Sequence, residues 1–249
     1  MMQPWKLEPA RDLGMPLGER LRSLRRECGL IETAAHLCWG ALTRTYFALA
    51  HRLTVRGQEH LPAAAPFILA ANHASHLDAL VLASVLPWRL RDRIFPVAAG
   101  DTFFQTPLLA AFAAGVLNAL PMWRRNCGPH ALLQLRQRLV EEPCAYILFP
   151  EGTRSRDGKI GRFKCGLGML AAEANVPVVP CHLDGTFAAL PPHSWLPRWR
   201  KITLTIGEPL CFATTPNERD GWEEIAQTVE GSIRRLGGVE LREGFPSQS

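Results

Sequence analysis

The sequence lacks the cysteine spacings of a zinc site or a disulfide framework. None of its seven cysteines forms a CxxC pair, and the set is odd and scattered through apolar stretches. Such cysteines are typical of free thiols in a reducing compartment, so we expect neither a structural zinc ion nor a disulfide. The cysteines stand at positions 28, 38, 127, 144, 165, 181 and 211.

Features of nucleic-acid binding are also scarce. There are only two tyrosines, and no basic run is interleaved with aromatic residues, so nucleic acid is not expected as a partner. The net charge of +5 nevertheless favours anionic partners, such as phosphates or acidic lipid surfaces. The excess is too small to choose between them.

Two stretches bear on targeting. The first twenty residues carry six charged side chains and no apolar core, so we expect no secretory signal. Residues 102–123 carry no charge and are numerous enough to cross a bilayer. Because Pro107, Gly115, Asn118 and Pro121 interrupt this stretch, we interpret it as a buried or interfacial helix followed by a strand.

The length of 249 residues suits one large domain with a terminal accessory piece. No internal repeat and no linker divides it. We expect a loose segment at 1–20, an amphipathic helical element at 21–52, an α/β domain at 53–238 and a tail at 239–249.

Between positions 21 and 53, apolar residues recur at three- and four-residue steps, which is the pattern of an amphipathic helix with a basic counterpart. Such a helix can pack on the main domain or lie on an anionic membrane with its apolar face in the lipid, and the two are not exclusive. The apolar positions are Leu30, Ala34, Leu37, Cys38, Ala41, Leu42, Tyr46, Leu49 and Leu53, and the arginines are Arg20, Arg22, Arg25, Arg26, Arg44 and Arg52.

The remainder alternates short apolar runs with helical patterns, which predicts an α/β sheet covered by helices. Thr215-Pro216 is expected to begin the last helix, with proline at its first position, and Gly237-Gly238 to end it. Strands are expected at 53–56, 67–71, 94–98, 116–121, 144–149, 177–182 and 201–206, and helices at 77–86, 104–114, 129–141, 165–174 and 218–236.

Chemistry-bearing residues follow two of these strands. His73 and Asp78 come after the apolar run 67–71. They can meet only if the histidine lies in the strand-to-helix turn and the aspartate in the first helical turn. Asp78 would then hold one imidazole nitrogen and leave the other to accept a proton. Spacing alone leaves two alternatives open: a capped turn, or a metal site formed with His76.

The second cluster is the turn 149–155, Phe-Pro-Glu-Gly-Thr-Arg-Ser, which follows the apolar run 144–149. It presents backbone amides, hydroxyl groups and the Arg154 guanidinium, and Lys164 follows closely. Arginine forks match phosphate oxygens, and glycine lets a ligand approach the backbone. Both clusters fall at the open ends of strands, where sites of α/β proteins lie.

In this order and spacing, Asn72-His73 with Asp78, then Phe149 to Ser155, then Val176-Pro177-Val178-Val179-Pro180 resemble three sequence blocks of the glycerolipid acyltransferase family. That family includes the 1-acyl-glycerol-3-phosphate acyltransferases. The resemblance covers roughly residues 50–212 and implies a single mixed β-sheet covered by helices. The remaining block is matched loosely by Gly115 through Arg124, with Trp123 in place of the usual acidic residue.

The resemblance implies that His73 is the general base and Asp78 its orienting acid, which makes His76 a bystander. The acceptor phosphate would be held by Glu151, Gly152, Thr153 and Arg154, with Arg124 as a second clamp and Lys164 beside the oxyanion. The acyl donor would be a thioester of coenzyme A or of an acyl carrier protein, and no metal or cofactor is needed. The acceptor would be lysophosphatidic acid or, as an alternative, glycerol-3-phosphate, another lysophospholipid or a lyso-aminolipid. A non-catalytic lipid-binding protein is a further alternative.

The lysolipid acceptor and its product both partition into bilayers, so the resemblance implies work at the cytoplasmic face of a membrane, where the protein would be peripheral or monotopic. The helical element at 21–52 and the stretch 102–117 are expected contacts. Two further groups, one of tryptophans and one of basic residues, are candidates for contact with the membrane interface. These are Trp88, Trp195, Trp199 and Trp222, and Arg89, Arg91, Arg93, Arg198, Arg200 and Lys201.

Overall fold

A computed structural model describes residues 14–16, 19, 30–99, 105–122 and 129–238. In this part of the chain seven strands form one sheet in the order β1-β7-β6-β2-β5-β3-β4. Neighbouring strands run parallel except β6 and β7, which are antiparallel. The strands are β1 (Thr54–Arg56), β2 (Phe67–Ala71), β3 (Ile94–Ala99), β4 (Leu120–Met122), β5 (Ala145–Leu148), β6 (Val178–Asp184) and β7 (Thr203–Ile206).

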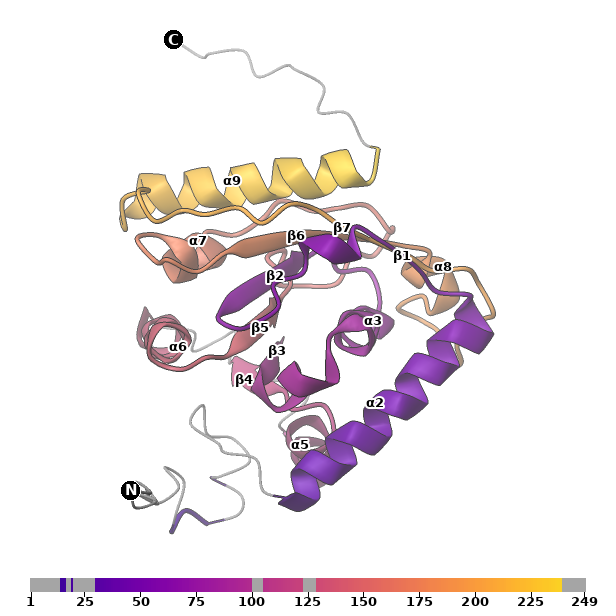
Figure 1. Ribbon diagram of the computed structural model, residues 1–249. Helices are drawn as coiled ribbons and strands as arrows, with labels where there is room; N and C mark the ends of the chain where they lie inside the picture. The colour runs from indigo at the N-terminus through magenta and orange to yellow at the C-terminus, as the bar shows by residue number, and fades with distance from the viewer. Residues whose placement is uncertain (1–13, 17–18, 20–29, 100–104, 123–128, 239–249) are drawn as a thin grey trace, which may run out of the picture.

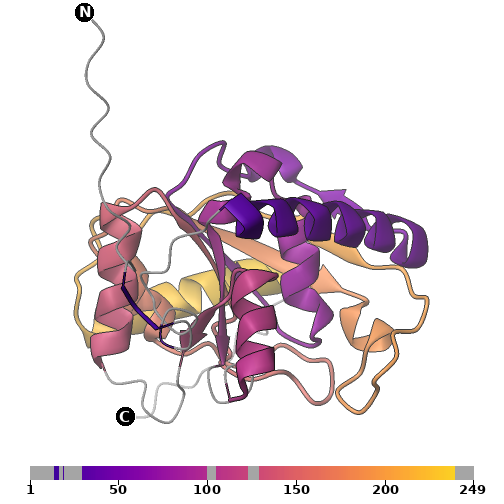
Figure 2. The same cartoon turned by 90° about the horizontal axis from the view of Figure 1, so that it is seen from below.

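Helices cover both faces of this sheet (Figure 1). On one side α9 lies over α7, with α6 beside them, and on the other side α3 separates the sheet from α2. Figure 2 shows α2 along the outside of the molecule. The α-helices are α2 (Leu30–His51), α3 (Leu77–Val85), α5 (Pro107–Gly115), α6 (Pro129–Glu141), α7 (Gly166–Ala171), α8 (Thr186–Ala189) and α9 (Arg219–Leu236); the 3-10 helices are η1 (Gln58–His60) and η2 (Trp88–Arg93).

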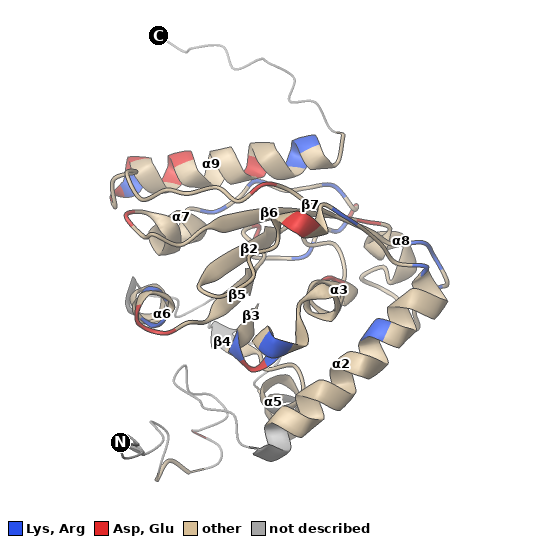
Figure 3. Ribbon diagram, viewed as in Figure 1, with Lys and Arg blue, Asp and Glu red and all other residues tan. Residues whose placement is uncertain are grey.

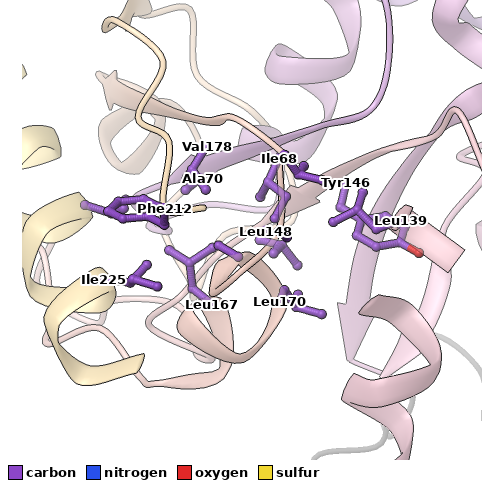
Figure 4. Packing of buried hydrophobic residues seen from close by; sticks show 14 of the residues in the cluster. Ile68, Ala70, Leu139, Tyr146, Leu148, Leu167, Leu170, Val178, Phe212 and Ile225 are labelled. Atoms are coloured by element: carbon purple, nitrogen blue, oxygen red, sulfur yellow. The ribbon is translucent and has the colours of Figure 1, made fainter. Parts of the chain in front are cut away.

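The central strand β2 is buried on both sides, which explains its unbroken apolar sequence. Because side chains alternate along a strand, Ile68 and Ala70 pack toward α6, α7 and α9, whereas Phe67 and Leu69 pack toward α2 and α3. Figure 4 shows the first of these clusters. The sheet is therefore the middle layer of three, with a core on each face.

The two chemistry-bearing turns meet because of strand order. β2 and β5 are parallel neighbours, and Ala70 pairs with Leu148 near the end of each. Their carboxyl ends consequently reach the same edge of the sheet, which places the segment after Ala71 beside the segment after Leu148.

Most expected elements are present, and the differences have local causes. The last helix does not begin at Pro216: α9 begins at Arg219, because the segment before it is tied to the end of α7 by the hydrogen bond from Glu173 N–H to the Thr215 carbonyl. α7 also ends at Ala171, earlier than expected, because the next turn brings Glu173 to a positive φ of 51°. β4 is shorter than expected because Asn118 turns the chain at φ 52°.

The uncharged stretch 102–123 contains α5 followed by β4, as the helix-and-strand interpretation predicts. Among the described helices, none combines the length and apolarity needed to cross a bilayer. The expected loose segment at 1–20 falls largely, and the tail at 239–249 entirely, outside the described residues.

Most of the apolar stripe expected along 21–53 faces outward where the structure describes it. On α2 the side chains of Leu37, Leu42, Tyr46 and Leu49 are exposed, up to 75% for Leu49. The buried positions are instead His36, Gly40, Thr43, Phe47 and His51. Figure 3 shows how little charge the outside of α2 carries. The four exposed side chains therefore do not pack against the main domain, whereas Leu53 at the end of the stripe does, and the exposed part of the stripe is open to another apolar phase.

Candidate active site

His73 and Asp78 lie in contact at the end of β2. Nδ1 of His73 is 2.9 Å from Oδ2 of Asp78. The same oxygen accepts the backbone N–H groups of Ala74 and Ser75 at 2.7 and 2.8 Å. Because those N–H groups can only donate, Oδ2 is an acceptor and Nδ1 of His73 is its third donor. The lone pair of the imidazole thus resides on Nε2, where it can take a proton.

The turn that carries this pair is held by its neighbours. Asn72 donates from Nδ2 to the carbonyl of Leu183 and accepts the Leu183 N–H, so it fixes the turn to β6. His73 precedes α3 and Asp78 stands in its first turn, which is the arrangement predicted from their spacing. The Asp78 side chain is fully buried, whereas that of His73 is 20% exposed. The ring therefore faces outward from a rigid, buried support.

Glu151 braces the first turn against the second. Its Oε1 accepts the N–H of His73 at 2.8 Å, and its Oε2 accepts the N–H of Gly161 at 2.9 Å. The residue is buried, and burial raises the pKa of its carboxyl, with the two backbone donors acting in the opposite direction. Both oxygens are thus committed to backbone donors, which makes Glu151 a support for the backbone at His73.

Further contacts tie the second turn to the histidine. The Phe149 ring stacks on the His73 ring with centroids 4.1 Å apart, and the Ser155 N–H donates to the His73 carbonyl at 2.8 Å. Gly152 has a φ of 73°, which favours glycine. A Cβ at Gly152 would also approach Lys164 Nζ to 2.7 Å. The glycine therefore permits both the turn and the close approach of Lys164.

The remaining predicted residues gather around one cavity. It has a volume of about 1360 Å³ and is lined by His73, Gly152, Thr153, Arg154 and Lys164 at one end. Arg124 lies outside the described residues. The structure thus brings six of the eight predicted site residues to the cavity or to the His73–Asp78 pair, and Glu151 lies behind them as a support.

Away from these polar groups the cavity wall is apolar. It extends along α3, β3 and α5 and reaches α2 and α7. Its volume exceeds the roughly 300–1,000 Å³ of ordinary small-molecule pockets, so it has room for a long chain. The apolar side chains of its wall include Leu80, Ala83, Leu86, Ile94, Val97, Phe112, Val116, Leu117, Leu148, Leu167 and Leu170.

Sequence reasoning missed the inner side of α2. His36, Trp39 and Thr43 line the cavity, and His36 Nδ1 lies 2.7 Å from Oδ1 of Asp92. The signal was present as a second helical stripe at positions 36, 40, 43, 47 and 51, but the stronger apolar stripe on the opposite side concealed it.

His76 lies between His73 and Asp78 in the sequence but has a different environment. Although its side chain is partly exposed, desolvation lowers its pKa to about 4, and the positive charges of Arg154 and His73 act in the same direction. Within the described part of the chain, no group of three His, Cys, Asp or Glu residues is arranged to hold a metal ion. The metal alternative therefore finds no geometric support there.

We expect Glu151→Gln to loosen the support of His73. An amide presents an N–H where one carboxylate oxygen accepted a backbone N–H, so one bond is lost and two donors face each other. The free energy of unfolding should fall by about 1–3 kcal/mol, and the ¹⁵N shifts of the His73 ring should move. Glu224→Gln, at an exposed position of α9, is the matched control. Equal unfolding curves for the two variants would contradict this role.

NMR titration of the His76 ring should give a midpoint near the value of about 4, well below the ordinary 6.5. Arg154→Gln should raise that midpoint, because it removes a nearby positive charge. Since the unfolded chain binds this proton near 6.5, the contribution of neutral His76 to stability should decline as pH falls from 6.5 toward 4. A midpoint that does not respond to Arg154→Gln would show that the two side chains are not neighbours.

Comparison with known proteins agrees with this geometry. The family model described as Acyltransferase matches residues 52–184, more than half of the chain. Human 1-acyl-sn-glycerol-3-phosphate acyltransferase alpha is 34% identical over 130 residues, covering 52% of this chain and 44% of that protein. The chloroplastic 1-acyl-sn-glycerol-3-phosphate acyltransferase BAT2 of Brassica napus is 31% identical over 145 residues, covering 57% and 40%. The alignments thus span less than half the length of these relatives.

A solved structure is similar over more of the chain. The crystal structure of the 1-acyl-sn-glycerophosphate (LPA) acyltransferase PlsC from Thermotoga maritima superimposes with a TM-score of 0.66 and 25% identity, covering 86% of this chain and 81% of that one. The predicted fold class, a single mixed sheet covered by helices, is confirmed. So is the resemblance drawn from the motifs: with the family model matched across the strands that carry both turns, this chain belongs to the acyltransferase family.

Proposed function

We propose that this protein transfers a fatty acyl group from an acyl thioester to the free hydroxyl of 1-acyl-glycerol-3-phosphate, which gives phosphatidic acid. The observation that carries the proposal is a His73–Asp78 pair in which Asp78 is buried and the His73 imidazole lines a large apolar cavity beside Arg154 and Lys164. The names of the human, Brassica napus and Thermotoga maritima relatives, all acting on this acceptor, support it.

Nε2 of His73 takes the proton of the acceptor hydroxyl as its oxygen attacks the thioester carbonyl carbon. Asp78 stabilises the imidazolium that forms, since its Oδ2 already accepts the Nδ1 proton. The tetrahedral intermediate then collapses, the carbon–sulfur bond breaks, and the imidazolium returns its proton to the leaving thiolate. The product is an ester, the thiol is released, and His73 is neutral again.

Polar groups at one end of the cavity would stabilise the two negative charges of this reaction, the acceptor phosphate and the oxyanion of the tetrahedral intermediate. In our proposal Arg154 and Thr153 bind the acceptor phosphate together with the backbone at Gly152, and Arg124 is a second clamp. Lys164, beside Gly152, is a candidate to stabilise the oxyanion. Glu151 acts through the backbone of His73 rather than through the substrate.

The apolar wall suits the acyl chains of both substrates. A lysolipid acceptor lies in a bilayer, so the site must work at a membrane surface, which we propose to be the cytoplasmic face. The outward apolar stripe of α2 and the exposed Leu108 of α5 are suited to that contact. The donor is coenzyme A or an acyl carrier protein thioester. Because a thioester is already activated, the reaction needs no metal or prosthetic group.

Removing either member of the catalytic pair should abolish most acyl transfer. Asp78→Asn keeps an oxygen for the three donors but removes the negative charge opposite the imidazolium. We expect kcat to fall by about 10²–10⁴ for His73→Ala and for Asp78→Asn, measured with a labelled acyl thioester. Asp220→Asn, at an exposed position of α9, should leave kcat unchanged. Wild-type rates in His73→Ala would remove the proposed base.

The same assay identifies the acceptor when kcat/KM is compared among several candidates dispersed in detergent. These are 1-acyl-glycerol-3-phosphate, glycerol-3-phosphate, other lysophospholipids and a lyso-aminolipid. Our proposal expects the highest kcat/KM for the first of these. A higher value for another acceptor would replace the substrate while keeping the chemistry, and transfer to none would leave a lipid-binding protein.

A bulky residue in the apolar wall should shorten the preferred acyl chain. Ala83 lines the cavity from α3, and Ala83→Phe would fill part of it. We expect kcat/KM for long-chain donors to fall by at least about tenfold, or 1.4 kcal/mol, while short-chain donors are used as before. Ala111→Phe, on an exposed position of α5, is the control. An unchanged chain-length profile would show that acyl chains lie elsewhere.

A further inference from the structure

The segment between α8 and β7 exposes large apolar side chains that the reaction does not use. We call residues 191–201 the tryptophan loop. Trp195 is 96% exposed, Leu196 79% and Trp199 83%. Tryptophan side chains are usually largely buried in soluble proteins, so two such residues four positions apart, with a leucine between them, require an explanation.

Hydrogen bonds fix the backbone of the loop in the conformation that exposes these side chains. Ser194 N–H donates to the Pro191 carbonyl at 3.0 Å, and Ser194 Oγ donates to the Leu196 carbonyl at 2.9 Å. Arg198 N–H donates to the Ala189 carbonyl at 2.7 Å and closes the base of the loop. Three prolines, at 191, 192 and 197, restrict the backbone further. Little conformational entropy is therefore lost when the loop meets a surface.

The loop also forms part of the cavity rim. Pro192 and His193 line the cavity, and Ser75 Oγ, beside the catalytic pair, donates to the Leu190 carbonyl at 3.0 Å. At its other end, the Arg200 carbonyl lies 3.0 Å from Nδ1 of His51, the last residue of α2. The exposed tryptophans thus stand between the cavity mouth and the helix with the outward apolar stripe.

Charge identifies the surface that the loop meets. From Gly185 to Gly207 the chain contains no Asp or Glu, while Arg198, Arg200 and Lys201 are all exposed. Among the described residues, no carboxylate forms an ion pair with these three. Figure 3 shows this basic segment in blue between α8 and the end of α2. Tryptophan flanked by arginine is the composition of a membrane–water interface.

Other tryptophan and arginine residues that the sequence offered as interfacial candidates differ from those of the loop, because they are partly buried. Trp222 is half-buried against the core cluster that α7 and α9 share, and its Nε1 donates to Asn217 Oδ1. Arg91 is half-buried, with its guanidinium against Gly40 of α2. Both are held by contacts within the protein.

We propose that the tryptophan loop is a membrane anchor for an anionic bilayer. Trp195, Leu196 and Trp199 enter the interfacial layer, Arg198 and Arg200 meet lipid phosphates, and the cavity mouth is thereby held against the surface that supplies the acceptor. This inference rests on the proposed function only in that the acceptor is a bilayer lipid.

Vesicle flotation tests the anchor. Vesicles of phosphatidylcholine with one-third phosphatidylglycerol are mixed with the full chain and with Trp195→Ala/Trp199→Ala. We expect the double variant to bind at least about tenfold more weakly, since two interfacial side chains are lost. Leu133→Ala/Val140→Ala removes exposed apolar side chains from α6 and should bind as the wild type does. Equal binding of the wild type and the tryptophan variant would overturn the proposal.

The basic residues are tested by vesicle composition. Arg198→Gln/Arg200→Gln should lose the preference for vesicles that contain phosphatidylglycerol over vesicles of phosphatidylcholine alone. The control is Arg219→Gln/Arg235→Gln, at exposed positions of α9, and it should keep that preference. If both pairs behave alike, the loop is not the site of anion contact.

Acyl transfer separates this inference from the proposed function. With acceptor dispersed in detergent, the tryptophan variant should transfer acyl groups at the wild-type rate, which also shows that it folds; with acceptor in vesicles it should be slower. A loss confined to binding of an acidic carrier protein, with vesicle binding intact, would assign the loop to a protein partner and overturn the anchor. If the wild type transfers nothing in detergent, the proposed function fails, and flotation alone still decides the anchor.

Discussion

One oxygen of Asp78 receives the imidazole of His73 and two backbone N–H groups, and the geometry of the site follows from that convergence. The three donors hold the turn after β2 in one shape and assign the proton of the histidine to Nδ1. Glu151 then joins this turn to the one after β5 through the backbone N–H of His73. An imidazole with a defined tautomer is therefore held beside the turn after β5 in the protein alone, which is the preorganisation that the proposed acyl transfer needs.

The sheet makes this possible because its central strands are parallel neighbours. β2 and β5 end at the same edge, and the cores on the two faces leave that edge as the place where polar turns can gather. The apolar cavity continues from these turns beneath α2. The cavity thus joins a polar end to an apolar interior, which suit the head group and the acyl chains of the proposed substrates.

The motifs were sufficient to predict the family and the meeting of His73 with Asp78, because a strand-to-helix turn allows only a few arrangements at that spacing. The strands were placed well, since each is a short apolar run bounded by turn residues. Element ends were predicted less well: α7 ends at Ala171 rather than at position 174, because Glu173 takes a positive φ and its N–H reaches the Thr215 carbonyl, a contact between residues distant in sequence. The role of Glu151 was not predictable either, because its partners are backbone N–H groups at positions 73 and 161.

By itself, the sequence determined which residues carry charges, imidazoles or thiols. It also determined the succession of strands and helices along the chain, because apolar periodicity is a local property. Only the tertiary structure decided which side of α2 faces the core. The helix carries an apolar stripe and an opposing stripe of His36, Gly40, Thr43 and Phe47, and periodicity alone cannot say which is buried. The second stripe is the one that fits against α3 and η2, because the Arg91 guanidinium occupies the space that a side chain at position 40 would fill. The leucines of the first stripe are consequently exposed.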